Sequence, residues 1–86
     1  MPWIIITLKR PEKSLSAIPK PERTNIEEAI DKLTQGPYVR GLDVKPLRGR
    51  PEWRLRVGRW RILFLVDGER VIITVVSVSP RGDSYK

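Results

Sequence analysis

The 86-residue chain contains neither cysteine nor histidine. Without cysteine there is no disulfide framework and no cysteine-based zinc site, which suits a reducing compartment. Without histidine the chain lacks the usual protein ligand for metals and the usual general base near neutral pH. We therefore expect no metal and no cofactor, so any chemistry must come from other side chains.

Long hydrophobic runs are also missing. The apolar stretch Trp3-Ile4-Ile5-Ile6 near the amino terminus is too short for a signal peptide or a membrane span. The chain length allows one domain, residues 1–86, and hydrophobic residues at 40% are enough for a small core. We expect a soluble, cytoplasmic protein that does not associate with membranes.

Acidic residues are scarce in one part of the chain. The net charge is +7, and residues 45–61 alone contribute +6, because seven basic residues there face one acid, Glu52. The seven are Lys45, Arg48, Arg50, Arg54, Arg56, Arg59 and Arg61. Such a concentration of charge suits a polyanion, such as nucleic acid, or an acidic protein. The excess of arginine over lysine favours planar, bidentate contacts to phosphate.

Residues 53–66 have the pattern of a β-hairpin. Apolar and basic residues alternate on both sides of Gly58-Arg59, as in half-buried strands, and glycine suits the first central position of a type II′ turn. This turn predicts that Arg56 lies opposite Arg61. The same register places Val57 opposite Trp60 and Leu55 opposite Ile62. One face then carries Trp53, Leu55, Val57, Trp60, Ile62 and Phe64. The other face carries Arg54, Arg56 and Arg61.

The opposed arginines allow two interpretations. Like charges directly opposite each other destabilise an antiparallel pair, by roughly 0.2–1 kcal/mol. An anion that bridges Arg56 and Arg61 would reverse the sign of that interaction. Alternatively, these side chains are only the solvated side of a strand. The two aromatic residues of the hairpin, Trp53 and Trp60, are expected in the core rather than stacked on bases.

The amino-terminal half of the chain predicts a strand at 3–8 and a short helix at 11–17. A second helix begins at Thr24, in the capping box Thr24-Asn25-Ile26-Glu27, or a turn earlier at Pro21. It ends at Gly36-Pro37. Its apolar stripe has helical spacing and consists of Ile26, Ala29, Ile30 and Leu33.

The remaining segments complete the predicted fold. Residues 38–50 are expected to form a connector, and Asp67-Gly68 indicates a type I′ turn. The last strand then spans 70–78, with Thr74 opposite Arg61. The prediction is an α+β fold with an antiparallel sheet of about four strands. An N-terminal helical hairpin packs on one face, in the order strand, helix, helix and three strands.

Three motifs follow one another in a specific order. They are Leu47-Arg48-Gly49, the hairpin Trp53-Arg54-Leu55-Arg56-Val57-Gly58-Arg59-Trp60-Arg61-Ile62-Leu63-Phe64, and the terminal Arg81-Gly82-Asp83-Ser84-Tyr85. With the strand and two helices before them, they make the whole chain resemble the RelE/ParE toxin superfamily of bacterial and archaeal toxin–antitoxin systems. The resemblance implies a single RelE-like toxin domain with a basic concave face.

The resemblance also implies an activity. The RelE branch cuts messenger RNA in the ribosomal A site, where the substrate 2′-hydroxyl attacks the neighbouring phosphate and leaves a 2′,3′-cyclic phosphate. The branch's catalytic positions fall on Arg56, Arg61, Arg81 and Tyr85, and its other basic position on the first hairpin strand falls on Arg54. Arg56 and Arg61 would hold the phosphate, Arg81 would neutralise the leaving oxygen, and Tyr85 would act as base or stack on a nucleobase.

The remaining basic residues have a more general expected role. Lys45 and Arg54 are expected to bind the RNA, and Arg48, Arg50 and Arg59 are expected either to attract its phosphates or to contact the antitoxin. The chain departs from the family pattern in two ways. Arginines stand where some relatives have lysines on the first hairpin strand, so a lysine base is lost. Many relatives also carry a histidine before the terminal arginine, where this chain reads Val78-Ser79-Pro80.

Three functions are compatible with the resemblance. The first is a ribosome-dependent, metal-independent endoribonuclease toxin. The second is a non-nucleolytic ParE-like toxin that inhibits DNA gyrase, and the third is an inactive relic that only binds an antitoxin. The expected protein partner is an acidic, partly disordered cognate antitoxin, because the basic window would attract it.

Overall fold

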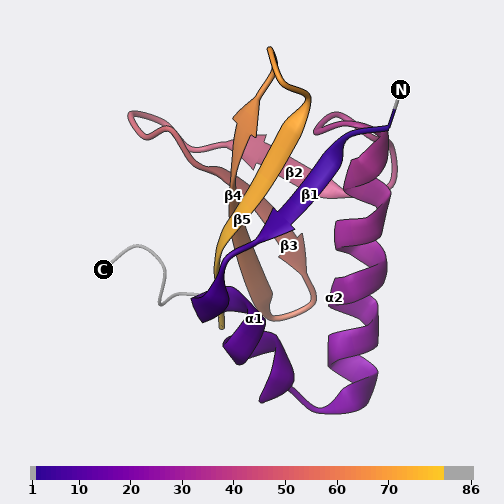
Figure 1. The fold of residues 1–86 in the computed structure, drawn as a ribbon. Coiled ribbons are helices and arrows are strands. Elements are labelled where there is room, and N and C mark those ends of the chain that lie inside the picture. The colour runs from indigo at the N-terminus through magenta and orange to yellow at the C-terminus, as the bar shows by residue number, and fades with distance from the viewer. Residues whose placement is uncertain (1, 81–86) are drawn as a thin grey trace.

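The computed structural model describes residues 2–80, which form five strands, two α-helices and a short 3₁₀ helix (Figure 1). The strands are β1 (Ile4–Thr7), β2 (Asp43–Pro46), β3 (Trp53–Val57), β4 (Trp60–Asp67) and β5 (Ile72–Pro80). The helices are α1 (Lys9–Ser16), α2 (Lys20–Lys32) and the 3₁₀ turn η1 (Leu33–Gln35). The α+β class is as predicted, and no helix within the described range combines the length and apolar character needed to cross a membrane.

The five strands form one mixed sheet in the order β1-β5-β4-β3-β2. Strand β1 runs parallel to β5, whereas the other neighbours are antiparallel. The prediction of about four antiparallel strands was therefore one strand short. The missing strand, β2, lies in the predicted connector and pairs with β3, with Val44 opposite Leu55.

The β3–β4 hairpin has the predicted register. Arg56 lies opposite Arg61 and Leu55 opposite Ile62. Gly58 has φ +57°, a left-handed conformation that costs glycine little because it has no Cβ. The turn therefore sets the register that places the arginines together.

The β4–β5 turn differs from the prediction. Asp67 pairs with Ile72, so four residues form the connection instead of the two of a type I′ turn. The Asp67 Oδ1 accepts hydrogen bonds from the backbone N–H groups of Glu69 and Arg70, both at 3.1 Å, and this side-chain turn replaces the tighter one. With a bulge between Leu63 and Phe64, the shift places Ser79 opposite Arg61, so the prediction of Thr74 was wrong.

Both helices contribute to a core on one face of the sheet, as predicted, and α2 runs along that face in Figure 1. The stripe Ile26, Ala29, Ile30 and Leu33 is buried. Helix α2 begins at Lys20, with proline in its first turn, because proline fits there without losing a hydrogen bond. The Thr24 capping box is consequently inside the helix, and the earlier of the two predicted starts is the better one.

The tip of the β3–β4 hairpin is tied to α2 through Glu22. The Arg59 guanidinium donates two hydrogen bonds to the Glu22 carboxylate, at 3.2 and 3.3 Å, and the Trp60 Nε1–H donates a third. Arg59 also lies 5.3 Å from the Trp60 ring centroid, within cation–π range. The hydrogen bond from Trp60, followed by Arg59, lowers the pKa of Glu22 from its ordinary 4.5 despite partial desolvation.

This lowered pKa predicts a pH-dependent contribution to stability. A carboxyl whose pKa is depressed by folding stabilises the protein above its unfolded pKa and loses that contribution as the pH falls through the folded pKa. We expect wild type to exceed Glu22→Gln in free energy of unfolding at pH 7, with the difference shrinking below about pH 4.5. Urea unfolding at several pH values measures this difference. A constant difference across the acid range would contradict the ionised Glu22 link.

Candidate functional site

The pairing of β2, β3, β4 and β5 places two rows of mostly charged and polar side chains on the sheet face opposite the helices. Directly paired residues project to the same side of a sheet. The first row consists of Asp43, Arg56, Arg61 and Ser79. The second row consists of Lys45, Arg54, Leu63 and Ser77. The three arginines predicted to share a face are therefore on one face.

Asp43 links two of these arginines. Its Oδ1 accepts a hydrogen bond from Arg54 Nη2 at 2.7 Å, and its Oδ2 lies 3.9 Å from Arg56 Nε. The Arg54 side chain is only 5% exposed, whereas the side chains of Arg56 and Asp43 are 34% and 53% exposed. The cluster therefore contains an ion pair between a buried arginine and an exposed carboxylate, with a more accessible arginine beside it.

Arg61 lies directly across the strand pair from Arg56 and is 7% exposed as a residue. Burial of a guanidinium is costly unless polar or charged groups compensate it. Arg56 and Arg61 also repel each other across the pair. This face therefore concentrates positive charge in partly desolvated surroundings, where its attraction for an anion is stronger than in bulk water.

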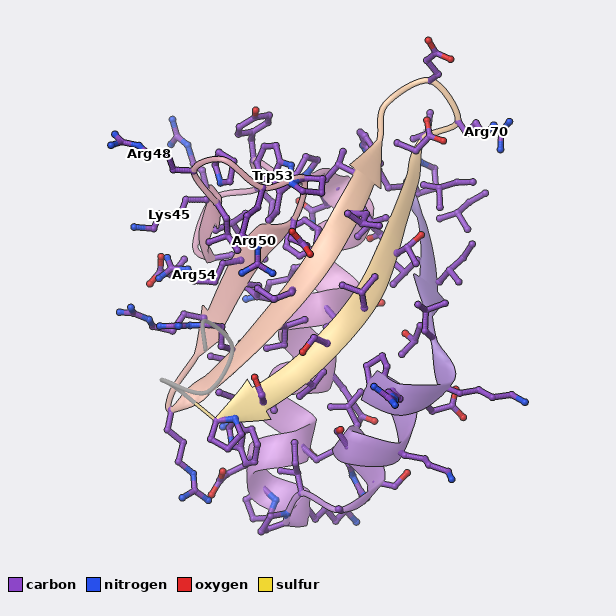
Figure 2. All side chains as sticks on the ribbon, turned by 90° about the vertical axis from the view of Figure 1, so that its left-hand side faces the viewer. Lys45, Arg48, Arg50, Trp53, Arg54 and Arg70 are labelled. Carbon is purple, nitrogen blue, oxygen red and sulfur yellow. The ribbon has the colours of Figure 1, made fainter. Side chains whose placement is uncertain are left out.

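The other basic residues of the 45–61 window extend this face along one side. Figure 2 shows Lys45, Arg48, Arg50 and Arg54 together on β2, β3 and the loop between these strands, with Arg70 at the distant tip of the β4–β5 hairpin. Arg50 pairs with Glu52 through two hydrogen bonds at 3.2 and 3.3 Å. The pKa of Glu52 is lowered, first by a hydrogen bond from its own backbone N–H and then by Arg50.

One of the predicted residues, Arg59, lies apart from this cluster of arginines. Arg59 is turned to Glu22 of α2, on the helix side of the sheet, and its side chain is 67% exposed. Arg81 and Tyr85 lie outside the described residues 2–80. Trp53 and Trp60 pack against the hydrophobic core, as predicted, and Trp53 stacks on Phe64 with ring centroids 6.2 Å apart.

Asp43 is the member of the site that sequence reasoning missed. It lies two residues before the basic window, in a segment expected to be a connector. The signal that could have revealed it is the short alternation Leu42-Asp43-Val44-Lys45, in which apolar and charged residues exchange places as in an edge strand. Pairing that segment with the hairpin would have placed Asp43 beside Arg56.

Comparisons with known proteins identify relatives of this chain. The family model described as the ParE toxin of the type II toxin–antitoxin system parDE matches residues 12–85. A predicted toxin of Methanocaldococcus jannaschii, RelE1, is 31% identical over 80 residues, which are 91% of this chain and 89% of that protein.

Solved structures share the fold. The archaeal RelE–RelB complex of Pyrococcus horikoshii OT3 contains a chain with TM-score 0.84 and 27% identity, over 98% of this chain and 100% of that one. A chain of the Mycobacterium tuberculosis toxin–antitoxin complex RelBE2 matches in fold, with TM-score 0.78 and 24% identity, over 94% and 100% of the two chains.

The fold and the matches together define a class of protein, a RelE-like toxin of a toxin–antitoxin system. Within the RelE/ParE superfamily, the chain belongs to the ParE toxin family of type II systems, whose model matches most of its length. The resemblance seen in the sequence motifs is thus confirmed at the level of the superfamily.

Proposed function

We propose that this toxin is an endoribonuclease that cuts messenger RNA in the ribosomal A site. The observation that carries the proposal is the juxtaposition of Arg56 and Arg61 on the sheet face opposite the helices. RNA can be cut by its own 2′-hydroxyl, so the reaction requires neither a protein nucleophile nor a metal. What it requires is in-line geometry and stabilisation of the negative charge that develops on the phosphorane.

Arg56 and Arg61 fit the second requirement. Two guanidinium groups facing one another across a strand pair can each donate two hydrogen bonds to phosphate oxygens. Binding of the phosphate would turn the repulsion between the two arginines into a bridged, attractive arrangement. Because the arginines are held by a paired sheet, little reorganisation would be needed during the reaction.

The remaining roles complete the proposed reaction. Arg81 neutralises the charge that appears on the 5′-oxygen leaving group, and Tyr85 removes the proton from the attacking 2′-hydroxyl. Lys45, Arg48 and Arg50 contact phosphates on either side of the cut, and Arg59 adds to the general attraction. Arg54, which is buried against Asp43, adds positive potential from beneath the surface.

The proposal is tested with purified toxin, ribosomes and a short messenger whose codon occupies the A site. We expect cleavage within the A-site codon, in the presence of EDTA, with a 2′,3′-cyclic phosphate on the upstream fragment. Mapping of RNA ends before and after treatment with a cyclic phosphodiesterase and phosphatase identifies this group. Intact messenger together with inhibition of gyrase supercoiling would contradict the proposal and favour the ParE-like alternative.

We also propose an acidic cognate antitoxin as the protein partner, with both proteins in the cytoplasm, where ribosomes translate messenger RNA. Two observations support this partner. The structural relatives from P. horikoshii and M. tuberculosis are chains of toxin–antitoxin complexes. The basic window of this chain, at net +6, would attract a protein of opposite charge.

A further inference from the structure

We infer that Asp43 is a positioning residue, which holds Arg54 and Arg56 in the arrangement that receives the phosphate. The inference rests on the proposed function and adds to it a residue that does not itself contact RNA. Its basis is the pair of contacts from one carboxylate, 2.7 Å to Arg54 Nη2 and 3.9 Å to Arg56 Nε.

The contact with Arg54 anchors the carboxylate. Arg54 is almost fully buried, and a buried guanidinium without an anionic partner is strongly unfavourable. At 2.7 Å the hydrogen bond is short, as charge-assisted bonds are. Asp43 is therefore held at a defined place on the edge strand β2, and Arg54 acts as its support.

The anchored carboxylate then acts on Arg56. The Nε atoms of Arg54 and Arg56 are buried and have no hydrogen-bond partner within residues 2–80. At 3.9 Å from Arg56 Nε, Asp43 Oδ2 attracts the guanidinium electrostatically without forming a hydrogen bond. Asp43 thus orients Arg56 near its buried Nε and does not engage the four Nη–H donors of the guanidinium, which are the ones proposed to bind phosphate.

The position of Asp43 in the sheet fits this role. Asp43 stands at the β2 end of its row, beyond Arg56, whereas Arg61 follows on the other side of Arg56. Arg56 would therefore lie between the Asp43 carboxylate and a phosphate bound between Arg56 and Arg61. This order limits repulsion between the two anions.

The test compares Asp43→Ala and Asp43→Asn with wild type in the ribosome cleavage assay, across a range of pH. Asp31→Asn is the matched control, because Asp31 is exposed on α2, away from the arginines. We expect Asp43→Ala to lower kcat roughly 10- to 100-fold, as small displacements of positioned groups do. Asp43→Asn should recover part of that loss, because its amide oxygen still accepts a hydrogen bond from Arg54. The shape of the pH profile should not change.

Three outcomes would overturn the inference. One is wild-type activity in Asp43→Ala, and another is a gain of activity, which would make Asp43 inhibitory. The third is an equal loss in both variants together with disappearance of the acid limb of the pH profile, because Asp43 would then act as the base itself.

A second readout keeps the inference separate from the proposed function. The ¹⁵N Nε–Hε signals of Arg54 and Arg56 report side-chain order without any RNA. We expect both signals to move or broaden in Asp43→Ala and to stay unchanged in Asp31→Asn. Inactive wild-type toxin would overturn the proposed function alone, whereas unchanged arginine signals in Asp43→Ala would overturn the role of Asp43.

Discussion

Arg56→Ala is expected to abolish growth arrest when the toxin is expressed without antitoxin, and to lower messenger cleavage about 10²- to 10³-fold. The reason is electrostatic, because removal of one preorganised donor to the charge that develops in a transition state has an effect of this size. Arg56 is also the most accessible of the three arginines on this face, so it is the one best placed for direct contact with the phosphate. The measurements are colony formation after induction and the rate of A-site cleavage by purified protein.

Two further variants make this result specific. Arg70→Ala removes an exposed arginine from the tip of the distant β4–β5 hairpin, and we expect it to leave cleavage unchanged (Figure 2). Arg56→Lys keeps the charge but loses the planar, bidentate donor arrangement, so we expect activity between those of wild type and Arg56→Ala. Growth arrest that survives in a folded Arg56→Ala protein would remove the main support for RNA cleavage at this face.

The arrangement of these arginines was predictable because one turn determines it. Gly58 occupies a left-handed conformation in a two-residue turn, and every pair of the β3–β4 hairpin follows from that turn. The alternation of apolar and basic residues then decides which face is buried. Local sequence was sufficient here, since the interacting residues are neighbours along the chain.

Prediction failed at the β4–β5 turn and at the edge strand β2. The Asp67-Gly68 motif fits a two-residue turn, but the hydrogen bonds from Glu69 and Arg70 to the Asp67 side chain stabilise a longer one. The four-residue strand β2 has too little pattern to be recognised alone, and it forms only because β3 offers a partner. Asp43 was missed for the same reason. The roles of Arg81 and Tyr85 stay predictions.

Phe64→Ala is expected to have the largest effect on stability, a loss of about 3–5 kcal/mol in the free energy of unfolding. Phe64 is fully buried at the centre of the sheet, opposite Trp53 and Val75, and its ring stacks on Trp53. Truncation would remove both the transfer free energy of the ring and the packing around the cavity left behind. A domain of this size has a total stability of roughly 5–15 kcal/mol, so the variant would be close to unfolding.

Leu65→Ala is the matched control, because Leu65 is the next residue on the same strand but is 38% exposed. We expect it to lose less than about 1 kcal/mol, as measured by urea unfolding followed through tryptophan fluorescence. Equal losses in the two variants would contradict the described core. Phe64 lies on the face opposite the arginines. Phe64→Ala should therefore weaken growth arrest only to the extent that the protein is unfolded. A toxin that loses activity through instability can therefore be distinguished from one that loses it through Arg56, whose removal should leave the urea midpoint nearly unchanged.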